Sequence, residues 1–269
     1  LGALAVLLPE SRAMRATAQP EPHHFDVWEH SLRMVEGADA VLAAPAADFA
    51  PDFFPDLGAH LAEDLGDGLT RRATLKLAAL LHDVAKPETR TETDGRVRFI
   101  GHDVIGAARA RAVVERLRLS RRAAAVVERL VRHHLRPMHL AQAGEITRRA
   151  RHRFFRDLGD DWPDLLLLAL VDAAALRGDP PLALWGDARG QVLRALMAGA
   201  TEEQALAAAP PLLRGEDVMV AFALPPGPEV GRLLARAREA QALGLVTTRE
   251  EALAELARPE PPALDPPHA

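Results

Sequence analysis

The sequence has 269 residues, of which 48% are hydrophobic and 26% are charged, and its formal net charge is −5. A chain of this length can form one large domain or two smaller ones with a sizeable core, and its composition excludes wholesale disorder and collagen. It contains no cysteine, which excludes disulfides, thiolate nucleophiles and cysteine-ligated zinc. His, Asp and Glu are left as the metal ligands.

The richest apolar run, residues 165–176, is interrupted by Asp172 and is shorter than the ~20 residues that cross a bilayer. The sequence starts at Leu1 without a basic stretch that leads into a hydrophobic signal, so we expect a truncated piece of a cytoplasmic protein with no membrane span. Acidic residues outnumber arginines in 1–70, whereas arginines outnumber acidic residues in 90–122. This asymmetry predicts a basic face and favours nucleic acid, although the overall pI of 6.1 argues against it.

Apolar residues recur at spacings of three and four, which predicts an all-α fold. In chain order, helices are expected over 27–42, 70–81, 104–117, 121–134 and 164 to about 176. Thr70 and Ser120 are expected to cap the second and fourth of these, and Pro163 to open the last. The one strand candidate is a hairpin over 91–99 that turns at Asp94-Gly95.

Gly178, Pro180 and Pro181 end the last of these helices, and alanine-rich helices are expected beyond them over 187–209 and 231–242. Thr248 and Glu251 form a predicted capping box for a short helix to about Ala257. The expected organisation is an N-terminal connecting segment (1–24), a helical bundle (25–180), a smaller helical region (181–258) and a disordered proline-rich tail (259–269).

Four residues stand where a polar group needs an explanation, namely His30, His82, Asp83 and Asp172. Burying a lone carboxylate destabilises the fold by on the order of several kcal/mol unless the carboxylate is paired or binds a metal. Two imidazoles and two carboxylates suit a divalent ion such as Mg, Mn, Fe, Co, Ni or Zn. Taken singly, each has a structural alternative, because Asp172 can cap a turn or pair with arginine and the histidines can be satisfied core residues.

Two cations are candidate phosphate ligands. Lys86 follows His82 by four residues on the same side of a helical turn, and Arg136 follows a pair of neighbouring histidines, His133 and His134. Either cation can equally be a solvated surface charge. The histidine pair can also cap a helix or bind an RNA phosphate.

The order His30, His82-Asp83, Asp172 resembles the His…His-Asp…Asp signature of the HD superfamily of metal-dependent phosphohydrolases. In members of that superfamily with two metals, further histidines lie between the His-Asp pair and the last Asp, and the central Asp bridges the ions. The resemblance implies the same role for His102, His133 and His134, with one or two ions bound.

Longer stretches of the sequence resemble one particular family within this superfamily. They are similar to the C-terminal HD region of bacterial tRNA nucleotidyltransferases of the poly(A) polymerase type. The similar segments are 82–87, 98–107, 116–120 and 132–137, with 8–10 and 25–30 before them and 226–234 and 247–252 after them. The resemblance covers residues 1 to about 257. The transferase head of that family carries a Gly-Ser turn and an Asp-x-Asp pair, and this sequence contains neither.

We therefore expect an HD-type helical bundle with a helical tail that hydrolyses a phosphomonoester or phosphodiester of a nucleotide or an RNA end. Asp83 would orient water, while Lys86 and Arg136 would offset developing charge. The alternative is a tRNA-holding region whose HD site is structural or vestigial. In that case arginines of 146–156 would grip phosphate beside Phe154 and Phe155, which would stack on a base, although a solvated basic helix face explains this stretch more simply.

Overall fold

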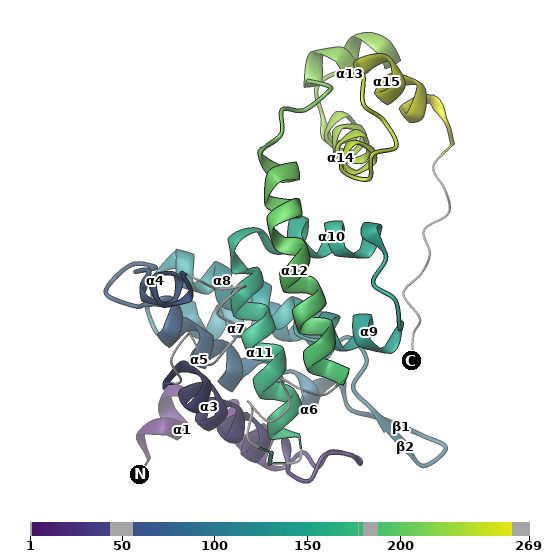
Figure 1. Cartoon of the computed structure of the whole chain (residues 1–269). Coiled ribbons are helices and arrows are strands. Elements are labelled where there is room, and N and C mark those ends of the chain that lie inside the picture. The colour runs from purple at the N-terminus through teal and green to yellow at the C-terminus, as the bar shows by residue number, and fades with distance from the viewer. Residues whose placement is uncertain (1, 44–55, 177, 180–187, 260–269) are drawn as a thin grey trace. The chain divides into compact units, whose positions relative to one another are not determined.

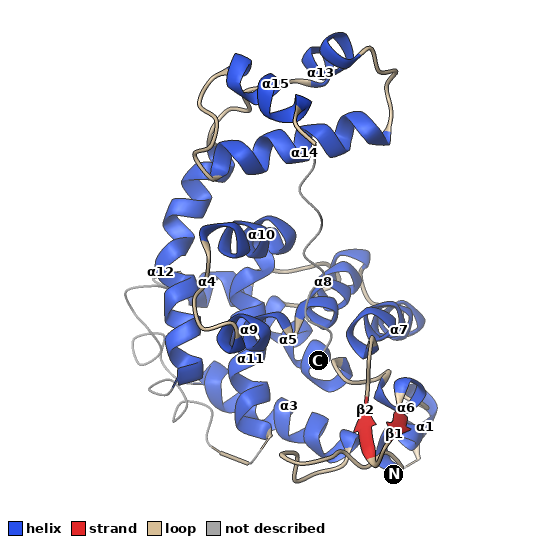
Figure 2. Cartoon of the chain, turned by 90° about the vertical axis from the view of Figure 1, so that its right-hand side faces the viewer, coloured by secondary structure: helices blue, strands red, loops and turns tan. Residues whose placement is uncertain are grey.

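A computed structural model describes residues 2–43, 56–176, 178–179 and 188–259, and in these residues the fold is all-α. The helices are α1 (Ala3–Leu7), α2 (Ser11–Arg15), α3 (Val27–Ala43), α4 (Leu57–Ala62), α5 (Arg71–Leu81), α6 (Lys86–Thr89), α7 (His102–Arg116), α8 (Arg121–His133), α9 (Arg136–Gln142), α10 (Arg148–Leu158), α11 (Trp162–Ala175), α12 (Ala188–Ala208), α13 (Gly215–Phe222), α14 (Pro228–Ala242) and α15 (Arg249–Ala257) (Figure 1). A hairpin of β1 (Thr91–Thr93) and β2 (Arg96–Arg98) accompanies them, and Figure 2 shows its two strands in red.

The described residues divide into two compact units. The larger contains the described parts of Leu1–Ile146 and Leu158–Ala198, and the smaller contains Thr147–Asp157 with the described residues from Gly199 onward. The sequence predicted that the boundary between the bundle (25–180) and the smaller helical region (181–258) lies at residue 180. The structure instead assigns the first part of α12 to the larger unit and most of α10 to the smaller one, because tertiary contacts rather than composition group these helices.

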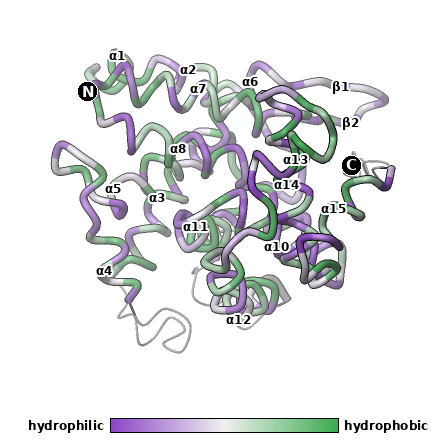
Figure 3. The backbone as a smooth tube through the Cα atoms, turned by 90° about the horizontal axis from the view of Figure 1, so that it is seen from above, coloured by the Kyte–Doolittle hydropathy of each residue, from purple (hydrophilic) through white to green (hydrophobic). Residues whose placement is uncertain are grey.

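Helices α3, α5, α7, α8 and α11 form the bundle of the larger unit, in which α7 packs on α8 and α3 packs on both α5 and α11. Small residues such as Ala107, Ala110 and Ala124 are buried where α7 meets α8, which allows close packing. Hydrophobic and hydrophilic stretches alternate along these helices in Figure 3, as amphipathic helices require. Helix α11 is the exception, because all of its leucines are buried.

Local sequence signals explain where the helices begin. The side chains of Thr70 and Ser120 accept hydrogen bonds from the amides of Ala73 (3.3 Å) and Ala123 (3.0 Å), as predicted. Thr248 and Glu251 form the predicted capping box of α15. The hairpin pairs Thr93 with Arg96 across its two-residue turn, again as predicted. The predicted all-α class is therefore confirmed.

The N-terminal segment has more structure than the sequence predicted. Residues 1–24 were expected only to connect, but the segment contains α1 and α2, and Met14 of α2 is fully buried in the bundle core with Trp28. Its apolar positions are too short a run to show helical periodicity, so only packing reveals them. The predicted tail, 259–269, lies outside the described residues except for Pro259. No helix among the described residues is both long and apolar enough to cross a membrane.

Candidate metal centre

Six side chains from five parts of the larger unit converge on one point. His30 comes from α3, His82 and Asp83 from the turn after α5, and His102 from the first position of α7. His134 follows α8, and Asp172 lies in α11. Their donor atoms form two groups, each with all atoms within 4.8 Å of one another: His30, His82 and Asp172 in the first, and Asp83, His102 and His134 in the second.

Asp83 belongs to the second group, and its carboxylate also lies next to the first group. Its Oδ2 atom is 2.9 Å from Nε2 of His82 and 3.9 Å from Nε2 of His30. Its other oxygen, Oδ1, is 3.4 Å from Nε2 of His102 and 3.8 Å from Nε2 of His134. One carboxylate therefore presents one oxygen to each group, which is the arrangement that a carboxylate bridging two cations requires.

Backbone hydrogen bonds aim three of the imidazoles. The Nδ1 atoms of His82, His102 and His134 donate to the carbonyl oxygens three residues earlier, at 2.9, 2.6 and 2.6 Å. This bond orients each ring so that Nε2 points at Asp83, and in a neutral ring it leaves the lone pair on Nε2. A positive φ at Gly101 (77°) turns the chain from β2 into α7 and places His102 at the start of that helix.

Burial keeps two of these rings neutral. Desolvation lowers the pKa of His134 to about 4 and also lowers that of His102. Burial opposes charge on His82 as well, but the neighbouring Asp83 carboxylate outweighs it and raises the pKa of His82. Burial alone would raise the pKa of Asp83, yet the charges of His82 and Lys86 hold that pKa well below its usual range. Asp83 is thus ionised and available as a ligand at neutral pH.

Asp172 joins the first group through His30, whose Nε2 lies 3.0 Å from Oδ1 of Asp172. Burial works against its ionised form, but this hydrogen bond and the charge of His30 hold the pKa of Asp172 below its ordinary value. The Asp172 side chain is 32% exposed. Asp172 is therefore less buried than the apolar sequence around it suggested.

The residues present fit a divalent cation. The Asp83 side chain is only 1% exposed, and Lys86 and His82 lie at ion-pair distance from its Oδ2 atom, at 2.7 and 2.9 Å. Its Oδ1 atom has only the imidazoles of His102 and His134 nearby, at 3.4 and 3.8 Å. A buried carboxylate oxygen without a close partner is costly, and a cation bound beside Oδ1 would remove that cost. Imidazole nitrogens with carboxylate oxygens are ligands for Mn, Fe, Co, Ni or Zn more than for Mg, which prefers oxygen.

Lys86 reaches the same centre, and the sequence did not indicate what holds it there. Its Nζ lies 2.7 Å from Oδ2 of Asp83 and 5.4 Å from the centre of the Phe99 ring. The same Nζ donates to Oε1 of Gln19 at 2.7 Å, and Nε2 of Gln19 donates to the carbonyl oxygen of Phe25 at 3.2 Å. Gln19 stands in the segment that was expected only to connect, and no spacing signal marked it.

His23 is a second neighbour of the site that the sequence did not indicate. Its ring centre lies 5.7 Å from that of His30, and its Nδ1 lies 3.2 Å from the carbonyl oxygen of Pro20. Burial and the nearby charge of Lys86 lower the pKa of His23 to about 4. The ring is therefore neutral beside the first group at physiological pH.

Two predicted residues stand apart from the two groups. His133 is half-buried and belongs to neither, so the structure places His134 rather than its neighbour at Asp83. Successive residues at the end of a helix point about 100° apart, and only one can face the centre. Arg136 opens α9 two residues after His134 and is half-buried.

Comparisons with known proteins agree with this geometry. Residues 56–173 match the HD domain family, and this range contains His82, Asp83, His102, His134 and Asp172. The chain contains an HD domain. His30, Gln19 and His23 precede the matched range, so the helix and segment before it complete the centre of the HD domain.

Similarity extends over nearly the whole chain. It is 36% identical over 260 residues to the A-adding tRNA nucleotidyltransferase of Deinococcus radiodurans, with 94% of this chain and 51% of that protein covered. It is 37% identical over 258 residues to the CC-adding tRNA nucleotidyltransferase of Thermus thermophilus, with 94% and 50% covered. A bifunctional uridylyltransferase/uridylyl-removing enzyme of Ruegeria pomeroyi is 29% identical over 199 residues, with 74% and 20% covered.

These matches confirm the resemblance that the motifs predicted, namely an HD region like that of tRNA nucleotidyltransferases. The chain spans about half the length of the two tRNA nucleotidyltransferases that it matches. Their similarity continues beyond the HD domain into the smaller unit, because 94% coverage reaches well past residue 173.

Helix α10 does not offer the base-stacking surface that the sequence suggested. Phe154 is completely buried and Phe155 is 8% exposed, and the two rings pack edge to face at 5.4 Å. The arginines of α10 make ion pairs with carboxylates of the smaller unit, among them Arg151 with Glu202 and Arg153 with Glu239. The alternative in which these phenylalanines stack on a base is therefore not supported, because both side chains are buried.

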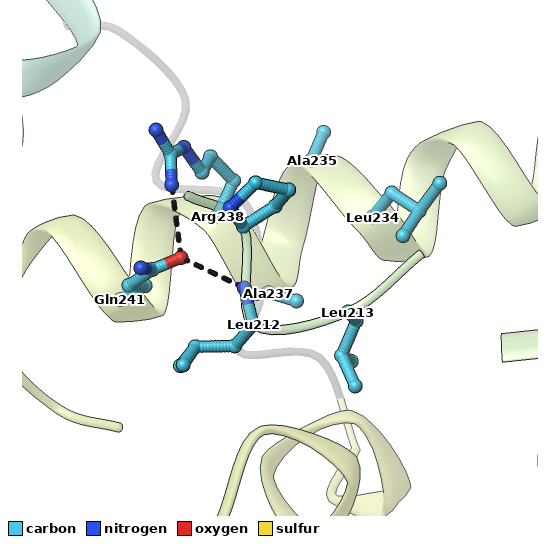
Figure 4. A pocket seen from close by; sticks show the side chains of 8 residues that line it. Leu212, Leu213, Leu234, Ala235, Ala237, Arg238 and Gln241 are labelled. Atoms are coloured by element: carbon cyan, nitrogen blue, oxygen red, sulfur yellow. Dashed lines mark hydrogen bonds between the residues drawn. The ribbon is translucent and has the colours of Figure 1, made fainter. Parts of the chain in front are cut away.

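The smaller unit also contains a cavity of about 340 Å³ (Figure 4). Gln241 accepts a hydrogen bond from Arg238 (3.0 Å) and another from the amide of Leu212 (3.4 Å) at its edge. The other lining residues are apolar, and no histidine or carboxylate is among them. The cavity therefore lacks the groups that hold a metal or move a proton, in contrast to the centre of the HD domain.

Proposed function

We propose that the HD domain is a metal-dependent phosphohydrolase that acts on phosphomonoesters or phosphodiesters of nucleotides or RNA ends. The observation that carries this proposal is the position of the buried Asp83 carboxylate, whose Oδ2 atom lies toward His30 and His82 and whose Oδ1 atom lies toward His102 and His134. His30, His82 and Asp172 would hold one divalent ion and His102 and His134 a second, with Asp83 shared. His133, the neighbour of His134, belongs to neither group of ligands.

A divalent cation in such a site supplies positive charge that polarises phosphoryl oxygens and increases the acidity of water. The chain's own residues supply the rest. Asp83 orients water through its carboxylate, and Lys86, held at the same point, neutralises charge that develops on the phosphoryl oxygens. Arg136, at the start of α9 beyond His134, is proposed as a second phosphate ligand, for which a planar guanidinium is suited.

The comparisons support a nucleotide or RNA substrate and tRNA as a partner. The names of two relatives describe action on tRNA, and the name of a third describes the removal of uridylyl groups. The identity of the metal is open among Mg, Mn, Fe, Co, Ni and Zn, with imidazole-preferring ions favoured by the ligands.

A phosphatase assay with and without a chelator tests the proposal directly. Purified chain is incubated with p-nitrophenyl phosphate, bis(p-nitrophenyl) phosphate and a nucleoside 2′,3′-cyclic phosphate in the presence of each metal in turn. We expect hydrolysis of at least one ester that stops on chelation and returns when the metal is restored. No hydrolysis of any ester with any of the metals would contradict the proposal.

The similarity to tRNA nucleotidyltransferases supports a second candidate, in which this region holds tRNA and its HD site is vestigial. Bound metal does not distinguish the two candidates, since a structural ion is compatible with both. Tight tRNA binding by a chain that hydrolyses none of the esters above would favour the second. Paired arginines and buried phenylalanines in α10 argue against that helix as the tRNA contact.

A further inference from the structure

The β1–β2 hairpin has two chemically different faces. Its register pairs Thr91 with Arg98 and Thr93 with Arg96, so these four side chains share one face, because alternate residues of a strand point to the same side. All four residues are exposed. We call this set the arginine face.

The opposite face carries the compensating acid. Glu92 pairs with Val97 in the register, and its carboxylate binds Arg90 at 2.9 Å. Neither Arg96 nor Arg98 makes an ion pair with any residue that the structure describes, in contrast to Arg90 next to the hairpin. The one carboxylate of β1, that of Glu92, is therefore paired on the opposite face, and the arginine face presents two guanidinium groups without an ion-pair partner to solvent.

The hairpin is attached to the metal centre at both of its ends. Helix α6, which begins with Lys86, leads into β1, and β2 leads through Phe99 and Gly101 to His102. The carbonyl oxygen of Phe99 accepts the hydrogen bond that orients His102 (2.6 Å). Figure 1 shows the two strands projecting from the helices beside α6.

Exposed apolar side chains follow the hairpin in sequence, on both sides of His102. Ile100 is 59% exposed, and Val104 and Ile105 in the first turns of α7 are 50% and 43% exposed. Large aliphatic side chains grouped in this way are unusual on a free surface. Next to cationic side chains they suit a ligand that combines a charged backbone with flat apolar rings, as a nucleic acid does.

We propose that the arginine face binds the phosphate backbone of a single-stranded RNA whose terminal phosphate enters the metal centre. Arg96 and Arg98 are two residues apart on one strand, about 6.6 Å along the chain, so that each guanidinium can contact a different phosphate. The hydroxyl of Thr93 adds a donor of the kind that commonly binds phosphate. The position of the RNA end rests on the proposed function, whereas the binding of the strand does not.

Fluorescence anisotropy with a 5′-labelled 12-nucleotide single-stranded RNA that ends in a 3′-phosphate tests this surface. The variant Arg96→Gln/Arg98→Gln removes both guanidinium charges, and Arg12→Gln/Arg121→Gln makes the same charge change at two exposed arginines elsewhere in the larger unit. We expect Kd to rise about tenfold in the hairpin variant and to change little in the control. The slope of log K against log salt should fall by about 1.4, at ~0.7 per lost phosphate contact.

Equal binding by wild type and the hairpin variant, or an equal loss in the control, would overturn the proposal. Hydrolysis is measured separately with p-nitrophenyl phosphate, which is too small to reach the hairpin, and its kcat/KM should be unchanged in both variants. RNA binding that depends on Arg96 and Arg98 in a chain without phosphatase activity would refute the proposed function alone. Phosphatase activity with RNA binding that ignores the hairpin would refute this inference alone.

Discussion

The ammonium of Lys86 lies 2.7 Å from the carboxylate of Asp83, and both side chains are almost completely buried. A cation that can bind a phosphate is thereby paired with the carboxylate that joins the two groups of metal ligands. A cation held by Asp83 would share in neutralising its charge, which would leave the Lys86 ammonium available to a phosphoryl oxygen. Charge neutralisation by the lysine and by metal are therefore coupled at this one residue.

Removing a central ligand should remove the metal and the activity together. Loss of a residue that only supports a metal ligand lowers metal affinity or activity roughly ten- to hundredfold. We expect His82→Ala and Asp83→Ala, which remove ligands themselves, to lower metal content and phosphohydrolase activity by more than this. Mass spectrometry of bound metal and ester hydrolysis are the measurements, with circular dichroism to show that the chain stays folded. His139→Ala, at an exposed histidine of α9, is the control. Full activity in either ligand variant would remove the catalytic assignment.

Metal should stabilise the fold, because bound cations compensate for Asp83. At a concentration one hundred times Kd the linkage contributes about 2.7 kcal/mol, which for a chain of this size corresponds to roughly 5 to 10 °C in Tm. Differential scanning fluorimetry with metal and with chelator measures the shift. In Asp172→Asn, which weakens the first group, the shift should shrink. Identical melting curves with metal and chelator in the wild type would show that the cluster holds no ion.

Gln19 should act as a positioning residue for Lys86. In Gln19→Leu the ammonium loses its neutral partner and stays bound to Asp83, so kcat/KM for ester hydrolysis should fall about tenfold, the size expected for a hydrogen bond to a charged group. A double-mutant cycle measures whether the effect passes through Lys86. In a Lys86→Met background the Gln19 substitution should have no further effect, and metal content should not change. An equal loss in both backgrounds would show a merely structural role.

The far end of α11 contains a buried ion cluster whose disruption should be costly. Nη1 of Arg71 binds Asp161 at 2.7 Å and Asp164 at 3.1 Å, and each of these three side chains is at most 4% exposed. Arg71→Met leaves two buried carboxylates short of a partner, so the free energy of unfolding should drop by about 3 to 5 kcal/mol. Urea denaturation is the measurement. Arg116→Met, which breaks a half-exposed pair with Glu10, should cost about 1 kcal/mol or less.

The chain should add no CMP or AMP to a tRNA 3′ end, because nucleotide addition needs paired carboxylates that position magnesium against a triphosphate. The sequence contains no Asp-x-Asp pair to do so. Incubation of highly purified chain with tRNA and labelled CTP or ATP checks this. Extension of the tRNA by the chain would contradict this prediction and show that these residues contain a nucleotide-adding site.

Much of the local structure could be predicted from the sequence. Helix caps at Thr70, Ser120 and Thr248, the Asp94-Gly95 turn and the apolar periodicity are short-range signals, and each depends on neighbours within a few residues. The sequence between Pro211 and Pro225 contains no short-range signal of this kind, so helix α13 was not predicted. Most metal-ligand candidates were also found, since a histidine or aspartate at the end of or within an apolar helix calls for a partner.

Only the tertiary structure decided which polar residues meet. The sequence by itself determined the helical class and supplied His30, His82, Asp83, His102 and Asp172 as candidates. Packing determined that His134 and not His133 faces Asp83, that Gln19 holds Lys86, and that Phe154 is core. These outcomes depend on contacts between residues far apart in the chain, where side-chain direction is set by how helices pack and not by spacing along one helix.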